Sequence, residues 1–145
     1  MKIPSIFCAM RLLLVCAVSH GANSDPLTGS WRVKSLLDSA PITATGDKQA
    51  KLLIGKRLIF NESSVRLGKD VCTQPEFTMS EEKTFEAFYD GYRTDPVNLR
   101  LPETVTAVNV KCKNRSEIAI FYVANKNRIV FYWLGFFFDA VRVGR

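Results

Sequence analysis

The chain has 145 residues, of which 47% are hydrophobic and 23% charged, and its formal net charge is +6 at pH 7. Length and composition are typical of one globular domain and exclude a disordered, collagen-like or solenoid protein. Arg11 interrupts the longest apolar run, so no conventional membrane-spanning helix is predicted.

Residues 1–24 are predicted to be a signal peptide. Lys2 supplies a basic start, residues 6–18 are mostly apolar, and small residues follow them. This order is typical of an export leader. We expect cleavage between residues 19 and 24, which leaves a single domain over residues 25–145 in the periplasm or outside the cell.

Two alternatives to a cleaved leader stay open. Leu13-Leu14-Val15-Cys16 partly matches a lipobox, although Val15 stands where a small residue is usual. A lipid anchor at Cys16 is therefore the first alternative. The second is a buried N-terminal helix, but the segment lacks the polar face and the cap of such a helix.

The first half of the remaining chain is predicted to form strands and a short helix. Residues 29–34 alternate in polarity, which places Trp31 and Val33 on one face of a strand. Asp47 is expected to cap a short helix that ends at Gly55. Further strands are expected at residues 57–60, 64–67 and 71–77.

Residues 80–92 carry the strongest helical pattern. Ser80 is expected to cap this helix, with Glu81 and Glu82 in its first turn. One aromatic face follows at helical spacing, made of Phe85, Phe88, Tyr89 and Tyr92. We expect the helix to pack as a lid on a β-sheet, and the alternative is a role in recruiting a ligand or a membrane.

The last third is predicted to form four strands, at residues 104–112, 117–123, 128–134 and 136–143. Phe131, Trp133 and Phe137 are expected in the core. Because the last two strands are apolar on both faces, one face should line the core and the other should be covered, with the helix as its candidate cover. The fold expected is mainly β, an antiparallel barrel or strongly curved sheet of about eight strands with one or two short helices.

Removal of the leader would leave two cysteines, Cys72 and Cys112, which are 40 positions apart. In an exported protein such a pair predicts a disulfide rather than a metal site or a nucleophile. A pair of buried free thiols is the alternative.

The distribution of titratable residues argues against catalysis. The only histidine, His20, lies in or beside the leader, so histidine-based nucleophilic pairs, zinc sites and general bases are not expected. There is also no glycine-rich phosphate loop. We therefore predict no enzyme activity, no catalytic residue, no metal and no cofactor.

The charge pattern does not predict nucleic-acid binding. Without Lys2 and Arg11 the chain has 18 basic and 14 acidic residues, a net charge of +4. The basic residues are scattered, and the densest cluster, at 111–115, has no interleaved aromatic residues.

Three short features resemble lipocalin-like, or calycin, barrels: Gly29-Ser30-Trp31 on the first strand, an antiparallel meander, and Arg142 on the last strand. The resemblance implies that Trp31 and Arg142 pack together at the closed end of a barrel. The chain is also similar, over residues 29–143, to small exported bacterial proteins of uncertain function. The shared features there are an early Gly-x-Trp, a Cys followed by Pro (72–75), a strand that ends in Cys (108–112) and a final Gly-Phe-Phe (135–137).

The function expected from these observations is that of a non-enzymatic exported binding module that meets a protein partner through surface loops, as inhibitor or immunity proteins do. The alternatives are a carrier of a small apolar ligand, which the lipocalin resemblance implies, and a structural envelope protein. The triplets at Asn61 and Asn114 would accept glycans only on a eukaryotic secretory route.

Overall fold

A computed structural model describes residues 26–144 of the chain. The expected signal peptide and the alternative lipid anchor at Cys16 lie outside the described residues. Within the described part, no helix is long and apolar enough to cross a membrane.

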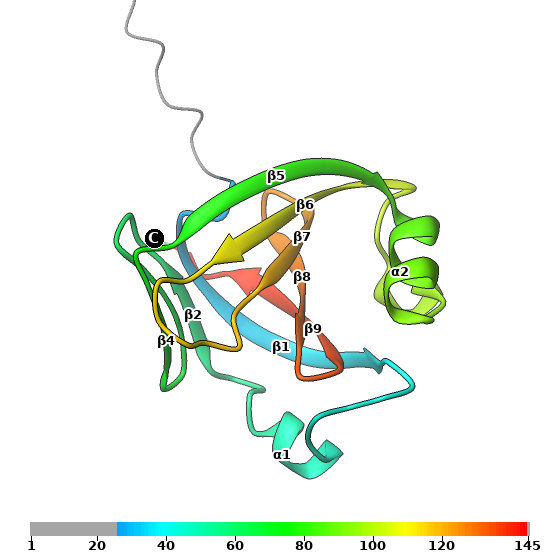
Figure 1. Cartoon of the computed structure of the whole chain (residues 1–145), viewed down its shortest axis with the longest axis horizontal. Helices are drawn as coiled ribbons and strands as arrows, with labels where there is room; N and C mark the ends of the chain where they lie inside the picture. Colours follow the sequence, from blue (N-terminus) through cyan, green and yellow to red (C-terminus); the bar gives the residue numbers. More distant parts are fainter. Residues whose placement is uncertain (1–25, 145) are drawn as a thin grey trace, which may run out of the picture.

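The described residues form one strongly curled antiparallel sheet of nine strands, with two short α-helices and a 3-10 helix (Figure 1). The elements in chain order are β1 (Gly29–Ser39), α1 (Asp47–Lys51), β2 (Arg57–Phe60), β3 (Ser64–Leu67), β4 (Asp70–Thr73), β5 (Glu76–Lys83), α2 (Thr84–Tyr92), η1 (Pro96–Leu99), β6 (Thr104–Lys111), β7 (Ile120–Asn125), β8 (Arg128–Trp133) and β9 (Phe136–Arg142). The expectation of a mainly β, strongly curved sheet is confirmed, and the sheet is a half-barrel.

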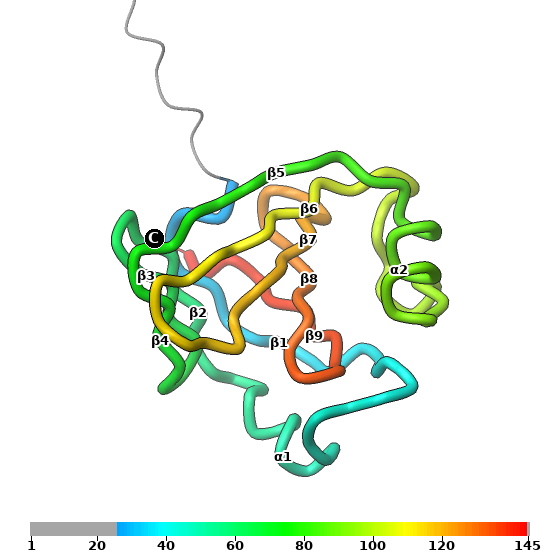
Figure 2. Tube along the Cα trace, in the orientation of Figure 1, coloured from blue at the N-terminus to red at the C-terminus, as the bar shows by residue number. Residues whose placement is uncertain are grey.

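The sheet is a meander in which β1 pairs with β9, so its order is β4-β3-β2-β1-β9-β8-β7-β6-β5. The two edge strands, β4 and β5, follow each other in the chain, as the trace in Figure 2 shows. Gln74 links them in the left-handed conformation, with φ of 45°, directly before Pro75. This turn divides the single strand expected over residues 71–77 into two, which explains why there are nine strands rather than eight.

The helix start expected at Ser80 is wrong. Ser80, Glu81 and Glu82 lie in β5, opposite Ala107, Thr106 and Val105 of β6. The ladder between these strands has eight residue pairs, and its backbone hydrogen bonds outweigh the local capping signal. The Ser80 hydroxyl instead bonds the Glu82 carboxylate, and α2 begins at Thr84. Asp47 likewise lies in the first turn of α1, where Gly46 is the N-cap.

Both faces of the sheet carry a hydrophobic cluster, as the continuous apolar pattern of the last strands predicts. The concave face is filled by side chains that include Trp31, Phe60, Phe121, Phe131 and Phe138. Helix α2 lies outside the curl of the sheet (Figure 1). Together with η1 it covers the convex face of β6 to β9, and the cluster buried there includes Phe88, Leu99, Tyr122, Val130 and Phe137. The expectation that the helix covers the second face is therefore confirmed.

Arg142 lies over the Trp31 ring, the contact that the Gly-x-Trp resemblance implies. Its guanidinium donates to the carbonyls of Pro26, Thr28 and Lys126, and the indole N–H donates to the carbonyl of Leu27. These bonds fasten the segment before β1 to the turn after β7.

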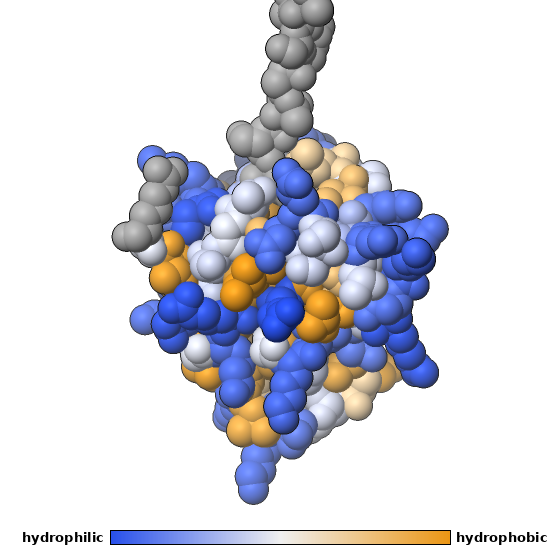
Figure 3. Space-filling view, turned by 90° about the vertical axis from the view of Figure 1, so that its left-hand side faces the viewer, coloured by the Kyte–Doolittle hydropathy of each residue, from blue (hydrophilic) through white to orange (hydrophobic). Residues whose placement is uncertain are grey.

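The Cys72–Cys112 disulfide joins β4 to the residue after β6, across the two edges of the half-barrel. Beside it, the Asn114 amide accepts from the Thr73 N–H at 2.8 Å and donates to the Val71 carbonyl at 2.7 Å, as a neighbouring strand would. The side of the molecule that holds β2 to β4 is mostly hydrophilic, with separate apolar spots (Figure 3).

Candidate functional site

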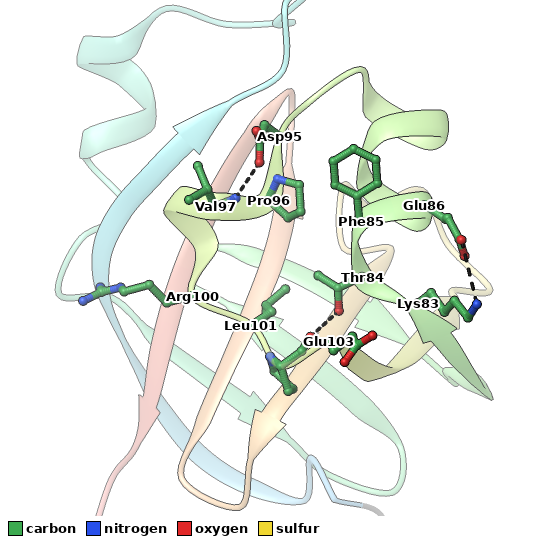
Figure 4. Close-up of a pocket in the computed structure, with 11 residues that line it drawn as sticks. Lys83, Thr84, Phe85, Glu86, Asp95, Pro96, Val97, Arg100, Leu101 and Glu103 are labelled. Atoms are coloured by element: carbon green, nitrogen blue, oxygen red, sulfur yellow. Dashed lines mark hydrogen bonds and ion pairs between the residues drawn. The ribbon is translucent and has the colours of Figure 1, made fainter.

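A cleft of about 400 Å³ lies between the start of α2 and η1 (Figure 4). Three segments line it, at residues 83–86, 95–97 and 100–103. We call these residues the α2–η1 cleft. Phe85 and Pro96 face each other across it, and charged side chains surround the apolar centre (Figure 4).

Local backbone chemistry fixes both walls of the cleft. Asp95 caps η1, because its carboxylate accepts from the Val97 N–H at 3.0 Å, and Pro96 occupies the first helical turn. Thr84, which is buried, starts α2 and donates its hydroxyl to the Pro102 carbonyl, while its N–H donates to the Glu103 carbonyl. The two walls are thus tied to the segment that enters β6.

Three apolar side chains at the cleft and beside it face solvent. Val97 is 70% exposed, Phe85 57% and Tyr89 49%. The rings of Phe85 and Tyr89 are stacked, with centroids 5.4 Å apart and an interplanar angle of 10°. Adjoining exposed apolar side chains on a globular protein mark interaction surfaces more often than isolated ones do.

The opposite side of the same helix is anchored. Phe88 is fully buried against Tyr122 and Phe137, and the Tyr92 ring packs on Tyr132. The hydroxyls of Tyr92 and Tyr122 lie 2.8 Å apart, and burial raises the pKa of both phenols. The aromatic face expected from the sequence is therefore divided, with Phe88 and Tyr92 toward the sheet and the stacked pair toward solvent.

The cleft has an acidic rim. Glu86, Asp95 and Glu103 border it, and the segment 76–103 has seven acidic and three basic residues. The Lys83 ammonium lies 4.0 Å from the Glu86 carboxylate, and the Arg100 side chain extends away from Phe85 (Figure 4). The rim therefore carries three carboxylates and two basic side chains.

The other residues singled out in the sequence belong to the scaffold. Trp31, Phe131 and Phe137 are buried, Trp133 is partly buried, and all are remote in the chain from the cleft. Among residues 26–144, no three His, Cys, Asp or Glu side chains come together as a metal site would require. The cleft itself combines an apolar centre with charged side chains at its rim.

Sequence reasoning missed η1 and with it half of the cleft. The available signal was Asp95-Pro96, a pair typical of a capped turn. Comparison with protein-family models, with curated proteins and with solved structures found no match.

Proposed function

We propose that the protein is an exported, non-enzymatic binding module that engages a protein partner through the α2–η1 cleft. The observation that carries this proposal is the exposure of Phe85, Tyr89 and Val97 on a helix and a turn that are otherwise firmly anchored. Exposed rings held by a rigid support lose little conformational entropy on binding, as is typical of interface anchors.

The chemistry of the cleft indicates what the partner presents. Phe85, Pro96 and Val97 would surround one apolar side chain. The carboxylates of Glu86, Asp95 and Glu103 would attract Lys or Arg residues on either side of it. The proposed partner is thus a protein segment with an apolar residue flanked by basic ones.

Export is supported by the disulfide, because such bonds persist in oxidising compartments. The pairing of Arg142 with Trp31 and the meander order support the lipocalin-like interpretation of the half-barrel. A carrier function receives less support, since buried rings such as Phe60, Phe121 and Phe131 occupy the concave face where a ligand would lie.

Selection from a displayed library of short random peptides tests the proposal. We expect enriched peptides with an aromatic or aliphatic residue beside Lys or Arg. Phe85→Ser and Val97→Ser should each weaken their binding by about tenfold or more, the equivalent of about 1.4 kcal/mol. Ile42→Ser is the matched control, because Ile42 is 84% exposed and does not line the cleft.

The thermal unfolding of all three variants should match that of the unmodified protein, since each side chain is exposed. Enriched peptides that are acidic, or that bind the Phe85 and Ile42 variants equally well, would contradict the proposal.

A further inference from the structure

A second hollow, of about 640 Å³, lies on the convex face where β8, β9 and β1 meet the segment after η1. Its lining includes Lys34, Ser35, Arg100, Arg128, Asp139 and Val141. It adjoins the α2–η1 cleft, because Arg100 and Pro102 border both. The hollow differs from the cleft in having three cations and one carboxylate among these residues.

The single carboxylate is already neutralised. Asp139 is 5% exposed and accepts a 2.6 Å hydrogen bond from the Ser35 hydroxyl, and its second oxygen lies 3.5 Å from the Arg128 Nε. The terminal nitrogens of Arg128 donate to the carbonyls of Leu99 and Arg100. Arg128 therefore has a fixed position, and it holds η1 and the residue after it against the sheet.

The other two cations of the hollow have no such partners. Within residues 26–144, neither the Lys34 ammonium nor the Arg100 guanidinium makes a hydrogen bond or an ion pair. Their charges face an open hollow whose only carboxylate is occupied. This leaves a net positive charge at the site.

The adjoining sheet surface extends the positive charge. One row of paired residues runs across β8, β9, β1 and β2, and its members are Arg128, Val141, Arg32 and Arg57. Three of these four residues are arginines. Arg32 and Arg57 are both exposed and neither makes an ion pair with a described residue. Like charges directly opposite each other destabilise a sheet, so a bound anion would relieve the repulsion between Arg32 and Arg57.

We propose that this hollow binds a multiply charged phosphate or sulfate group. Such a group accepts several charge-assisted hydrogen bonds at once, and the planar guanidinium of Arg100 suits it geometrically. Arg128 donates to Asp139 and to the carbonyls of Leu99 and Arg100. A guanidinium has five N–H groups, so the remaining N–H groups of Arg128 provide further donors. The Lys34 ammonium supplies the second mobile charge.

Isothermal titration with inorganic tripolyphosphate at low ionic strength tests the site on the purified protein. We expect saturable binding with one anion per chain. Lys34→Gln combined with Arg100→Gln should weaken it by about tenfold or more. Lys48→Gln combined with Lys51→Gln removes the same charge from α1, whose lysines do not line the hollow, and should change the affinity far less.

Lys34→Gln alone separates this site from the α2–η1 cleft, because Lys34 lines only the hollow. It should weaken tripolyphosphate binding and leave the binding of cleft-selected peptides unchanged. Co-sedimentation with vesicles that contain phosphatidic acid, whose phosphate monoester can carry two negative charges, compared with pure phosphatidylcholine vesicles, identifies the source of the phosphate. Loss of co-sedimentation in the Lys34/Arg100 variant assigns the phosphate to a lipid headgroup, and no co-sedimentation assigns it to a free anion.

Two results would overturn the proposal. One is the absence of saturable binding of tripolyphosphate at millimolar concentration. The other is an equal loss of affinity in the α1 control, which would show that net charge alone governs the binding. Unchanged thermal unfolding of the variants, whose substituted side chains are exposed, verifies that the comparison concerns folded protein.

Discussion

The guanidinium carbon of Arg142 lies 4.1 Å from the centroid of the Trp31 ring. The stacking joins the last strand to the first, and the same guanidinium donates to three backbone carbonyls. Arg142 therefore makes both a cation–π contact and charge-assisted hydrogen bonds. For this reason we expect it to contribute a large share of the stability of this end of the sheet.

Arg142→Leu keeps much of the side-chain volume but removes the donors, which leaves the carbonyls of Pro26, Thr28 and Lys126 without this partner. We expect the free energy of unfolding to fall by about 2–4 kcal/mol. Urea unfolding followed by Trp fluorescence measures it. Arg142→Lys should lose less, because it retains the charge over the ring, and a leucine variant as stable as the parent would show that water replaces the guanidinium at no cost.

The disulfide should contribute substantially to stability, because it closes a loop of 40 positions between β4 and the residue after β6. The double variant Cys72→Ala/Cys112→Ala is expected to lower the free energy of unfolding by about 2–5 kcal/mol. Reduction of the unmodified protein should produce a similar loss. A thiol assay of the unfolded, unreduced domain over residues 25–145, which lacks Cys8 and Cys16, should find no free thiol. Two reactive thiols in that domain would disprove the bond.

Gly135→Ala is expected to be strongly destabilising. Gly135 has φ of +96°, and an added Cβ would lie 2.6 Å from the Cα of Thr43 and 2.8 Å from the carbonyl oxygen of Ile42. Backbone strain alone costs about 1–3 kcal/mol, and the displaced loop adds to it. Calorimetric unfolding should therefore show a clear decrease in Tm.

Gly91→Ala is the matched control for that substitution. Gly91 lies in α2 with nothing within 4 Å of an added Cβ and no positive φ. Alanine there should stabilise the helix by about 0.5–1 kcal/mol. If both variants lost stability equally, the close approach of the loop to Gly135 would not be the cause.

Alkaline pH should destabilise the fold through Tyr92 and Tyr122. Both pKa values are raised above the ordinary value of 10.0, so the folded state keeps both phenols neutral after the unfolded chain begins to lose these protons. Their contribution is complete below pH of about 10 and is lost as the pH rises above it.

The variant Tyr92→Phe/Tyr122→Phe should accordingly show a shallower loss of unfolding free energy between neutral and strongly alkaline pH. Urea unfolding across that range measures the slope. Equal slopes in the variant and the parent would mean that other groups control alkaline unfolding.

Much of the scaffold could be predicted from the sequence because its pattern is local. Phe136-Phe137-Phe138 cannot alternate in polarity, so both faces of that strand had to be covered, and Phe137 indeed contacts Phe88 of α2. The pairing of Cys72 with Cys112 followed from the expected export of a chain with two remaining cysteines. Neither inference required knowledge of distant contacts.

The position of the cleft could not be predicted in the same way. Residues 80–82 carry a capping pattern, and only the partner strand β6 converts them into a strand. Helical spacing puts Phe85, Phe88 and Tyr89 on one stripe, whereas the docking angle on the sheet decides which ring is buried. The exposure of Val97 depends on that same docking, since η1 packs through Leu99.

Because β1 pairs with β9, the chain could be circularly permuted without a change in the order of the sheet. Pro26 and Arg142 are hydrogen bonded, and the N–H of Val143 donates to the carbonyl of Ser30, so the two ends of the described domain adjoin each other. The break in the sheet lies instead at Gln74, between β4 and β5. A circular permutant opened at Gln74 would run from β5 to β9 and then from β1 to β4, which is the order of the sheet itself. Every ladder would then join strands that are consecutive in the chain, and this lower contact order favours faster folding.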